Sequence, residues 1–237
     1  MNLFHVSGNK KAYTFEWGTN GSSVPKIGNF LWNSKSDRAK AADAMVKAIM
    51  VRVKENGGSE DVTLIGHSHG GNVAIQAVPG LRKALDDAGY KDVKINLVTV
   101  ATPADNKAGS KENPATYSTM INKHIHLWNE KDAIQKSGAN AFNTDIEYKN
   151  GLMNVPEKVD VFSKTYNNGF TQNVQLDVSK LYSGELAKVA GITIGYNNGV
   201  GAHSVDVNNP EVVKGAIDSG KIPKITGKKS KPSGLVN

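Results

Sequence analysis

The chain has 237 residues, a hydrophobic fraction of 38%, 24 glycines and no cysteine. This length and composition are typical of one folded domain with many turns, and the lack of cysteine excludes disulfides, thiolate nucleophiles and thiolate metal ligands. The formal net charge is +7. No apolar run approaches the roughly 18 residues of a membrane span, and no signal peptide is visible at the N-terminus, so we expect a soluble protein.

The first sixty residues predict a strand pair and a long helix. Apolar and β-branched residues favour strands at 3–6 and 12–17 with a turn between them, and a further short strand at 30–32. A helix is expected over 37–54, capped at Ser36, because apolar side chains recur there at helical spacing. These side chains are Ala42, Met45, Val46, Ile49 and Val53, and Asn56-Gly57-Gly58 follows as a stop signal.

The segment that follows carries the clearest motif of the chain. An apolar run, Val62 to Ile65, leads into Gly66-His67-Ser68-His69-Gly70 and then into a predicted helix that ends near Tyr90. This is the pattern of a nucleophile elbow, in which a serine sits on a tight turn between strand and helix. Such a pattern arises by chance in roughly one glycine-rich chain of this size in six. The flanking strand and helix therefore carry the prediction, and the alternative is a glycine-rich turn with an exposed serine.

The second half of the chain predicts more strands and a closing helix. Strands are expected at 94–100, 124–128 and 173–178, and a helix from 209 or 210 to 218. The alternation of strands with helices predicts an α/β fold, with a mainly parallel sheet covered by helices on both faces.

The predicted domain organisation is simple. Residues 1–224 are expected to form a single domain, in which the Asn- and Gly-rich stretch 136–200 is an insertion or lid. Residues 225–237 are expected to form a basic flexible tail.

A catalytic serine needs a histidine base. His203 is the best candidate, because it lies in a glycine-rich loop between the last predicted strand and the last predicted helix. The other five histidines are less suitable. His67 and His69 flank the serine in the turn, and His124 and His126 share one face of a strand expected in or near the core. His5 precedes the serine in the chain.

The histidine in turn needs a carboxylate that orients it. Asp132 fits best, because it follows the strand at 124–128. Glu130 is its nearest rival and Asp105 is less favoured. The chain order Ser68, Asp132, His203 is that of α/β-hydrolases.

The segment 66–73 resembles the elbow of bacterial lipase-like α/β-hydrolases found as C-terminal toxin domains of Rhs-type and related secreted effectors. Four other stretches are similar to that group: Phe30-Leu31-Trp32 with Ser34, Lys35 and Arg38; residues 98–103; residues 126–132; and residues 203–223. The resemblance implies an α/β-hydrolase fold and a serine esterase or lipase that cleaves acyl esters of lipids or phospholipids. It also implies export by a specialised bacterial system as part of a larger protein, and a cognate immunity protein as partner.

The oxyanion hole is only partly predicted. The backbone N–H of His69, the residue after the nucleophile, is expected to be one donor. The group that the chain resembles presents a His-Gly-Thr turn as the second donor, and the closest match is Trp17-Gly18-Thr19, which lacks the histidine. Gly18 or Thr19 is therefore the expected second donor, with Gly8-Asn9 as an alternative.

Other functions stay open at this point. A soluble ester, thioester or amide is an alternative substrate, and a hydrolase fold kept for binding is an alternative class. The basic charge is compatible with an anionic membrane surface, whereas no nucleic-acid motif is present and nucleic acid is not expected. A metal site built from His67-X-His69 and His124-X-His126 is a weaker reading, and no cofactor or metal is expected.

Overall fold

The computed structural model describes residues 2–6, 11–15, 35–105, 107–128, 132, 135, 148–149, 152–153, 169–175, 186–189 and 192–195. The elements in chain order are β1 (Asn2–Val6), β2 (Lys11–Phe15), α2 (Lys35–Glu55), β3 (Val62–His67), α3 (His69–Asp87), β4 (Ile95–Val100), the short 3-10 helix η1 (Pro114–Tyr117), β5 (Lys123–Trp128), β6 (Tyr148–Lys149), β7 (Leu152–Met153), β8 (Thr171–Gln175), β9 (Leu186–Val189) and β10 (Ile192–Gly195).

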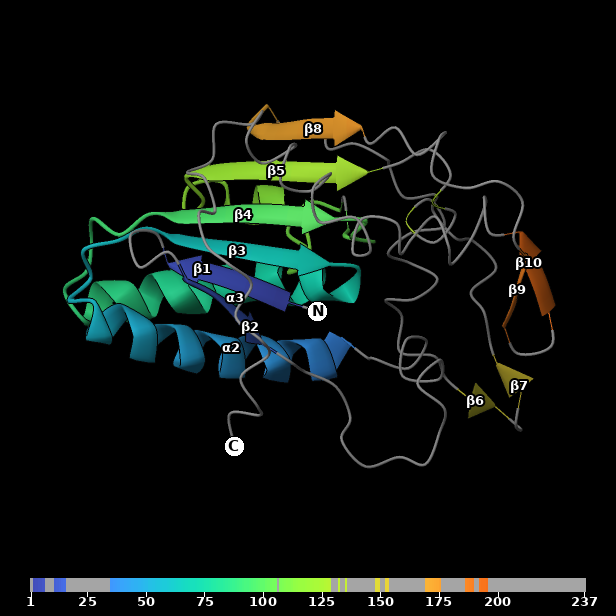
Figure 1. Cartoon of the computed structure of the whole chain (residues 1–237), viewed down its shortest axis with the longest axis horizontal. Helices are drawn as coiled ribbons and strands as arrows, with labels where there is room; N and C mark the ends of the chain where they lie inside the picture. The colour runs from blue at the N-terminus through green and yellow to red at the C-terminus, as the bar shows by residue number, and fades with distance from the viewer. Residues whose placement is uncertain are drawn as a thin grey trace.

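Six of these strands form one sheet in the order β2-β1-β3-β4-β5-β8 (Figure 1). β3, β4, β5 and β8 are parallel, and the β1–β2 hairpin joins β3 through an antiparallel pairing of β1. The four parallel strands therefore end at the same edge of the sheet, where their arrows point in Figure 1. The segments that follow β3, β4 and β5 all start at this edge, and so does the serine motif.

Both long helices cover one face of the sheet. α2 and α3 pack against each other, and their apolar side chains form a single cluster with strand residues such as Leu64 and Leu97, which are aligned in the register of β3 and β4. Ile65 and Val98 alternate to the opposite face and are buried as well. The helix expected at 209–218 lies outside the described residues, so helices are described on one face only.

Most predicted elements of the described chain are present. The strands at 3–6, 12–17, 94–100 and 124–128 correspond to β1, β2, β4 and β5, and the strand at 173–178 corresponds to β8, shifted toward the N-terminus. α2 begins at Lys35, so Ser36 lies in its first turn and not at the N-cap as predicted. Its end is as predicted: Gly57 and Gly58 both have positive φ, and the Gly58 N–H bonds back to the Val53 carbonyl.

Several predictions fall on other parts of the chain. The strand at 30–32, the tail at 225–237 and most of the stretch 136–200 lie outside the described residues. None of the described helices is long and apolar enough to cross a lipid bilayer.

Candidate active site

Ser68 lies on a strained turn between β3 and α3. Its φ is 54° and its ψ is −135°, a conformation that non-glycine residues rarely adopt and that costs about 1–3 kcal/mol. The turn is held by a hydrogen bond of 2.9 Å from the Ser68 N–H to the Val100 carbonyl. The Ser68 side chain does not cap the helix it precedes, and the residue is 7% exposed. This is the backbone geometry of the predicted nucleophile elbow.

Two glycines allow the helix to start this close to the sheet. A Cβ at Gly66 would collide with the backbone of Gly70 and Gly71, and a Cβ at Gly71 would collide with the side chain of Thr102. Glycine is therefore required at both positions for steric reasons. The spacing of glycines around Ser68 in the sequence thus has a direct structural cause.

The segment after β4 braces the elbow from the neighbouring strand. Ala101 also has a positive φ of 48°, which turns the chain sharply at the end of β4. The Thr102 hydroxyl lies 3.2 Å from the Val100 carbonyl and 3.4 Å from the Gly66 carbonyl, and the Asn72 side-chain amide donates to the Pro103 carbonyl at 3.3 Å. The position of Ser68 is thus set by both β3 and the segment that follows β4.

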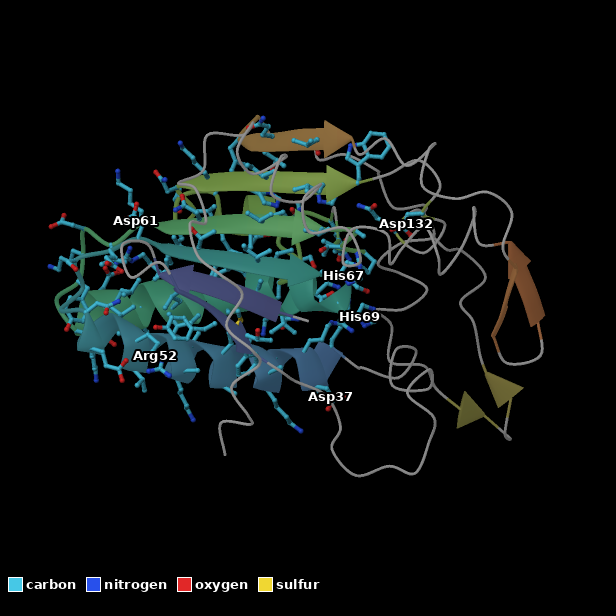
Figure 2. All side chains as sticks on the ribbon, in the orientation of Figure 1. Asp37, Arg52, Asp61, His67, His69 and Asp132 are labelled. Atoms are coloured by element: carbon cyan, nitrogen blue, oxygen red, sulfur yellow. The ribbon has the colours of Figure 1, made fainter. Side chains whose placement is uncertain are left out.

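The first turn of α3 offers the expected oxyanion donor. The N–H of Gly71 bonds to the Ser68 carbonyl, and His69, whose N–H is the predicted oxyanion donor, is the first residue of α3. His69 is buried, and Figure 2 shows it with His67 at the carboxyl edge of the strands. The positive end of the helix dipole favours an anion at this point.

The hairpin of β1 and β2 precedes both predicted positions of the second oxyanion donor or encloses them. Phe15 pairs with Asn2, which in turn pairs with Gly66, so β2 ends at the same edge as the elbow. Val6 pairs with Val62, so β1 ends at the opposite edge. Both predicted positions of the second donor, Trp17-Gly18-Thr19 and Gly8-Asn9, lie outside the described part of the chain.

Asp132 lies beyond the end of β5, at the same edge of the sheet as His67 and His69 (Figure 2). It is fully buried, and its Oδ1 accepts a hydrogen bond of 2.9 Å from the backbone N–H of Gln135. The rival Asp105 has a structural task, because its Oδ1 accepts from the Lys107 N–H at 2.8 Å and shapes the turn after β4. Glu130 and the proposed base His203 lie outside the described residues.

His124 and His126 belong to a buried chain of hydrogen bonds. Thr99 Oγ1 lies 2.9 Å from His124 Nε2 and 2.8 Å from His126 Nδ1. The second nitrogen of His124 bonds to Thr171 Oγ1 and that of His126 to Gln135 Nε2, both at 2.8 Å. Burial lowers the pKa of His124 well below its ordinary value, and His126 lowers it further, so His124 is neutral at pH 7. The prediction that both histidines pack and hydrogen-bond in the core is confirmed.

These contacts also bear on the metal reading. All four ring nitrogens of His124 and His126 are used in hydrogen bonds to neutral side chains. No group of three or more possible ligands is found within the part of the chain that the structure describes. The sequence prediction missed Thr99 and Gln135, and the only signal for them was that two histidines on one face of a core strand require polar partners.

A second buried polar group, also missed, ties α2 to the segment after β4. Arg38 Nε donates to Glu112 Oε1 at 2.6 Å and Arg38 Nη2 donates to Glu112 Oε2 at 3.2 Å. Gln76 of α3 donates to Glu112 Oε1 at 2.6 Å. Beside this group lies a cavity of about 330 Å³, and neither Ser68 nor Asp132 lines it.

Comparison with known proteins identifies one family. The family model described as "Alpha/beta hydrolase of unknown function (DUF900)" matches residues 3–187. The match spans the elbow and Asp132, and together with the parallel sheet it confirms the predicted α/β-hydrolase fold. His203 lies beyond the matched range. No curated protein and no solved structure matches the chain. The resemblance to Rhs-type toxin domains stays a prediction.

Proposed function

Since the chain belongs to this family of alpha/beta hydrolases, we propose that it is a serine esterase in which Ser68 is the nucleophile, His203 the base and Asp132 the orienting acid. The observation that carries the proposal is the strained backbone of Ser68, with φ 54° at the junction of β3 and α3. Strain of this kind persists where the surrounding structure enforces it, and it is concentrated at functional sites.

The proposed chemistry is acyl transfer in two steps. His203 removes the hydroxyl proton of Ser68 as Oγ attacks the ester carbonyl, and the tetrahedral oxyanion is held by the N–H of His69 and by a second donor at Gly18 or Thr19. His203 then gives the proton to the leaving alcohol. Water then attacks the acyl carbonyl while His203 takes a proton from it, and His203 gives that proton to Ser68 Oγ as the carboxylic acid leaves. Asp132 fixes the tautomer of His203 and stabilises its positive charge.

The proposed substrate class rests on the resemblance and on the net charge. The resemblance to lipase-like effectors and the net charge of +7 favour acyl esters of lipids, including phospholipids with anionic head groups. On this proposal the protein acts as a lipase or phospholipase toxin, exported as part of a larger protein and neutralised by an immunity protein. A short soluble ester, a thioester or an amide is the alternative substrate.

The test is covalent labelling with a fluorophosphonate, read as intact mass. The wild-type protein should gain one adduct and hydrolyse p-nitrophenyl butyrate, whereas Ser68→Ala should do neither. Ser59→Ala is the matched control, because the Ser59 hydroxyl is exposed and bonds to the Asn56 carbonyl at the end of α2. Labelling of Ser68→Ala, or turnover by it, would refute the proposed nucleophile.

Two further variants test the other members of the triad. Asp132→Asn should retain more activity than His203→Ala, because the acid acts through the histidine. A neutral effect of Asp132→Asn would transfer the role to Glu130 or Asp105. A vesicle and ester panel then separates lipid from soluble substrates.

A further inference from the structure

The hydrogen bonds around His124 and His126 form one continuous buried chain. It runs from Thr171 on the edge strand β8, through His124 on β5 and Thr99 on β4, back to His126 on β5, and ends at Gln135. Thr99, His124, His126 and Gln135 are each at most 1% exposed. Such a polar chain is stabilising only when each of its members is satisfied.

When Gln135 Nε2 faces His126, the donors and acceptors of these hydrogen bonds have one consistent order. An amide nitrogen only donates, so His126 Nε2 accepts and the proton of His126 resides on Nδ1. This Nδ1–H donates to Thr99, the Thr99 hydroxyl donates to His124 Nε2, and the Nδ1–H of His124 donates to Thr171. Every contact then holds one proton, and both rings are neutral.

Gln135 connects this chain to Asp132. Its side chain bonds to His126 on β5, while its backbone N–H bonds to Asp132 Oδ1 at 2.9 Å. Both residues are buried, and both follow β5 directly. The geometry points to Gln135 as a positioning residue that fixes the Asp132 carboxylate relative to the sheet, an inference that rests on Asp132 being the acid of the proposed triad.

The expected effect is on turnover and not on substrate binding. Gln135→Met keeps the side-chain volume and the backbone N–H but removes the tether to His126. A displacement of a catalytic group by ~1 Å costs on the order of 100-fold in rate, so kcat for p-nitrophenyl butyrate should fall by about 10- to 100-fold while KM changes little. Gln76→Met is the matched control, since it also removes one side-chain hydrogen bond, to Glu112, and should leave kcat unchanged.

A double-mutant comparison separates positioning from general destabilisation. If Gln135 acts through Asp132, Gln135→Met should lower kcat strongly in the wild-type background and hardly at all in the Asp132→Asn background. Equal losses in both backgrounds, or equal losses of kcat in Gln135→Met and Gln76→Met, would overturn the inference. Melting temperatures of all variants show whether each is folded at the assay temperature.

The two proposals fail in different ways. If the wild-type protein neither reacts with the fluorophosphonate nor hydrolyses the ester, the proposed function fails and the positioning role fails with it. If the wild type is active and Asp132→Asn is impaired, but Gln135→Met retains full kcat, the positioning role alone fails.

Discussion

The buried ion pair between Arg38 and Glu112 provides a sharp test of how burial sets the energetic cost of breaking an ion pair. The Arg38 and Glu112 side chains are 0% and 2% exposed, and the shortest distance between their charged groups is 2.6 Å. The Glu112 carboxylate accepts from two nitrogens of Arg38 and from Gln76. Replacement of Glu112 by Gln puts an amide donor against these donors and removes the negative charge that faces the buried Arg38 guanidinium.

The expected loss follows from that burial. Removal of one partner of a buried pair costs about 3–5 kcal/mol, because the remaining charge is not compensated. For a domain of this size, 1 kcal/mol corresponds to roughly 2–4 °C in melting temperature. Glu112→Gln should therefore lower the melting temperature by on the order of 10 °C. The double variant Arg38→Met/Glu112→Leu should be near the wild type, because an apolar replacement removes both desolvation costs.

Lys83 and Asp87 form the matched control. Their charged groups also lie 2.6 Å apart, but their side chains are 76% and 63% exposed. Asp87→Asn should cost at most about 0.5 kcal/mol, as for other exposed pairs on helices. Urea denaturation at pH 7 measures the free energy of unfolding of the wild type and of the three variants. If Glu112→Gln and Asp87→Asn lost the same stability, the reasoning from burial would be refuted.

Three further predictions concern the elbow, pH and the tail. Gly71→Ala should destabilise the protein by about 1–3 kcal/mol through overpacking against the Thr102 side chain, and Thr102→Ala in the same chain, which removes both Oγ1 and Cγ2, should recover part of that loss; thermal unfolding of the two variants decides this. The pKa of His124 is lower in the folded protein than its ordinary value of 6.5, so on acidification the unfolded chain takes up the proton first. The contribution of His124 to the free energy of unfolding should therefore be constant above about pH 6.5. Below that pH, the free energy of unfolding should fall by up to about 1.4 kcal/mol per pH unit. Urea titrations at several pH values should show a flatter slope in His124→Gln, and an unchanged slope would contradict this origin. Deletion of residues 225–237 should leave hydrolysis of p-nitrophenyl butyrate intact; a deleted chain that fails to fold would show that the tail is part of the domain.

Local signals in the sequence predicted the elements and the elbow. The apolar run before Gly66 and the helical pattern after Gly70 are properties of neighbouring residues, so β3, Ser68 and α3 could be placed without knowledge of the fold. The hairpin of β1 and β2 and the end of α2 at Gly57 were predictable for the same reason.

Contacts between distant residues could not be predicted in this way. Arg38 and Glu112 lie 74 positions apart, and no local pattern connects them. The antiparallel insertion of β1 between β2 and β3 is equally invisible, because a strand pattern does not specify its neighbours. Gln135 falls in a stretch of sequence with no clear periodicity. Its hydrogen bond to His126 can therefore be recognised only from the folded structure.

The connection between β5 and β8 has a consequence for how proteins of this kind can diversify. It spans residues 129–170, roughly twice the length of the 101–122 connection between β4 and β5, and each doubling of a flexible connection costs only about 0.6 kcal/mol. Length and composition can therefore change there at little cost to the scaffold. Asp132 and Gln135 are buried and joined by a hydrogen bond, so the part that can be exchanged begins after Gln135. A graft between that point and Thr171 would therefore leave the sheet and its buried polar contacts as they are in the parent, so a library of such grafts could be screened for substrate preference without rebuilding the scaffold.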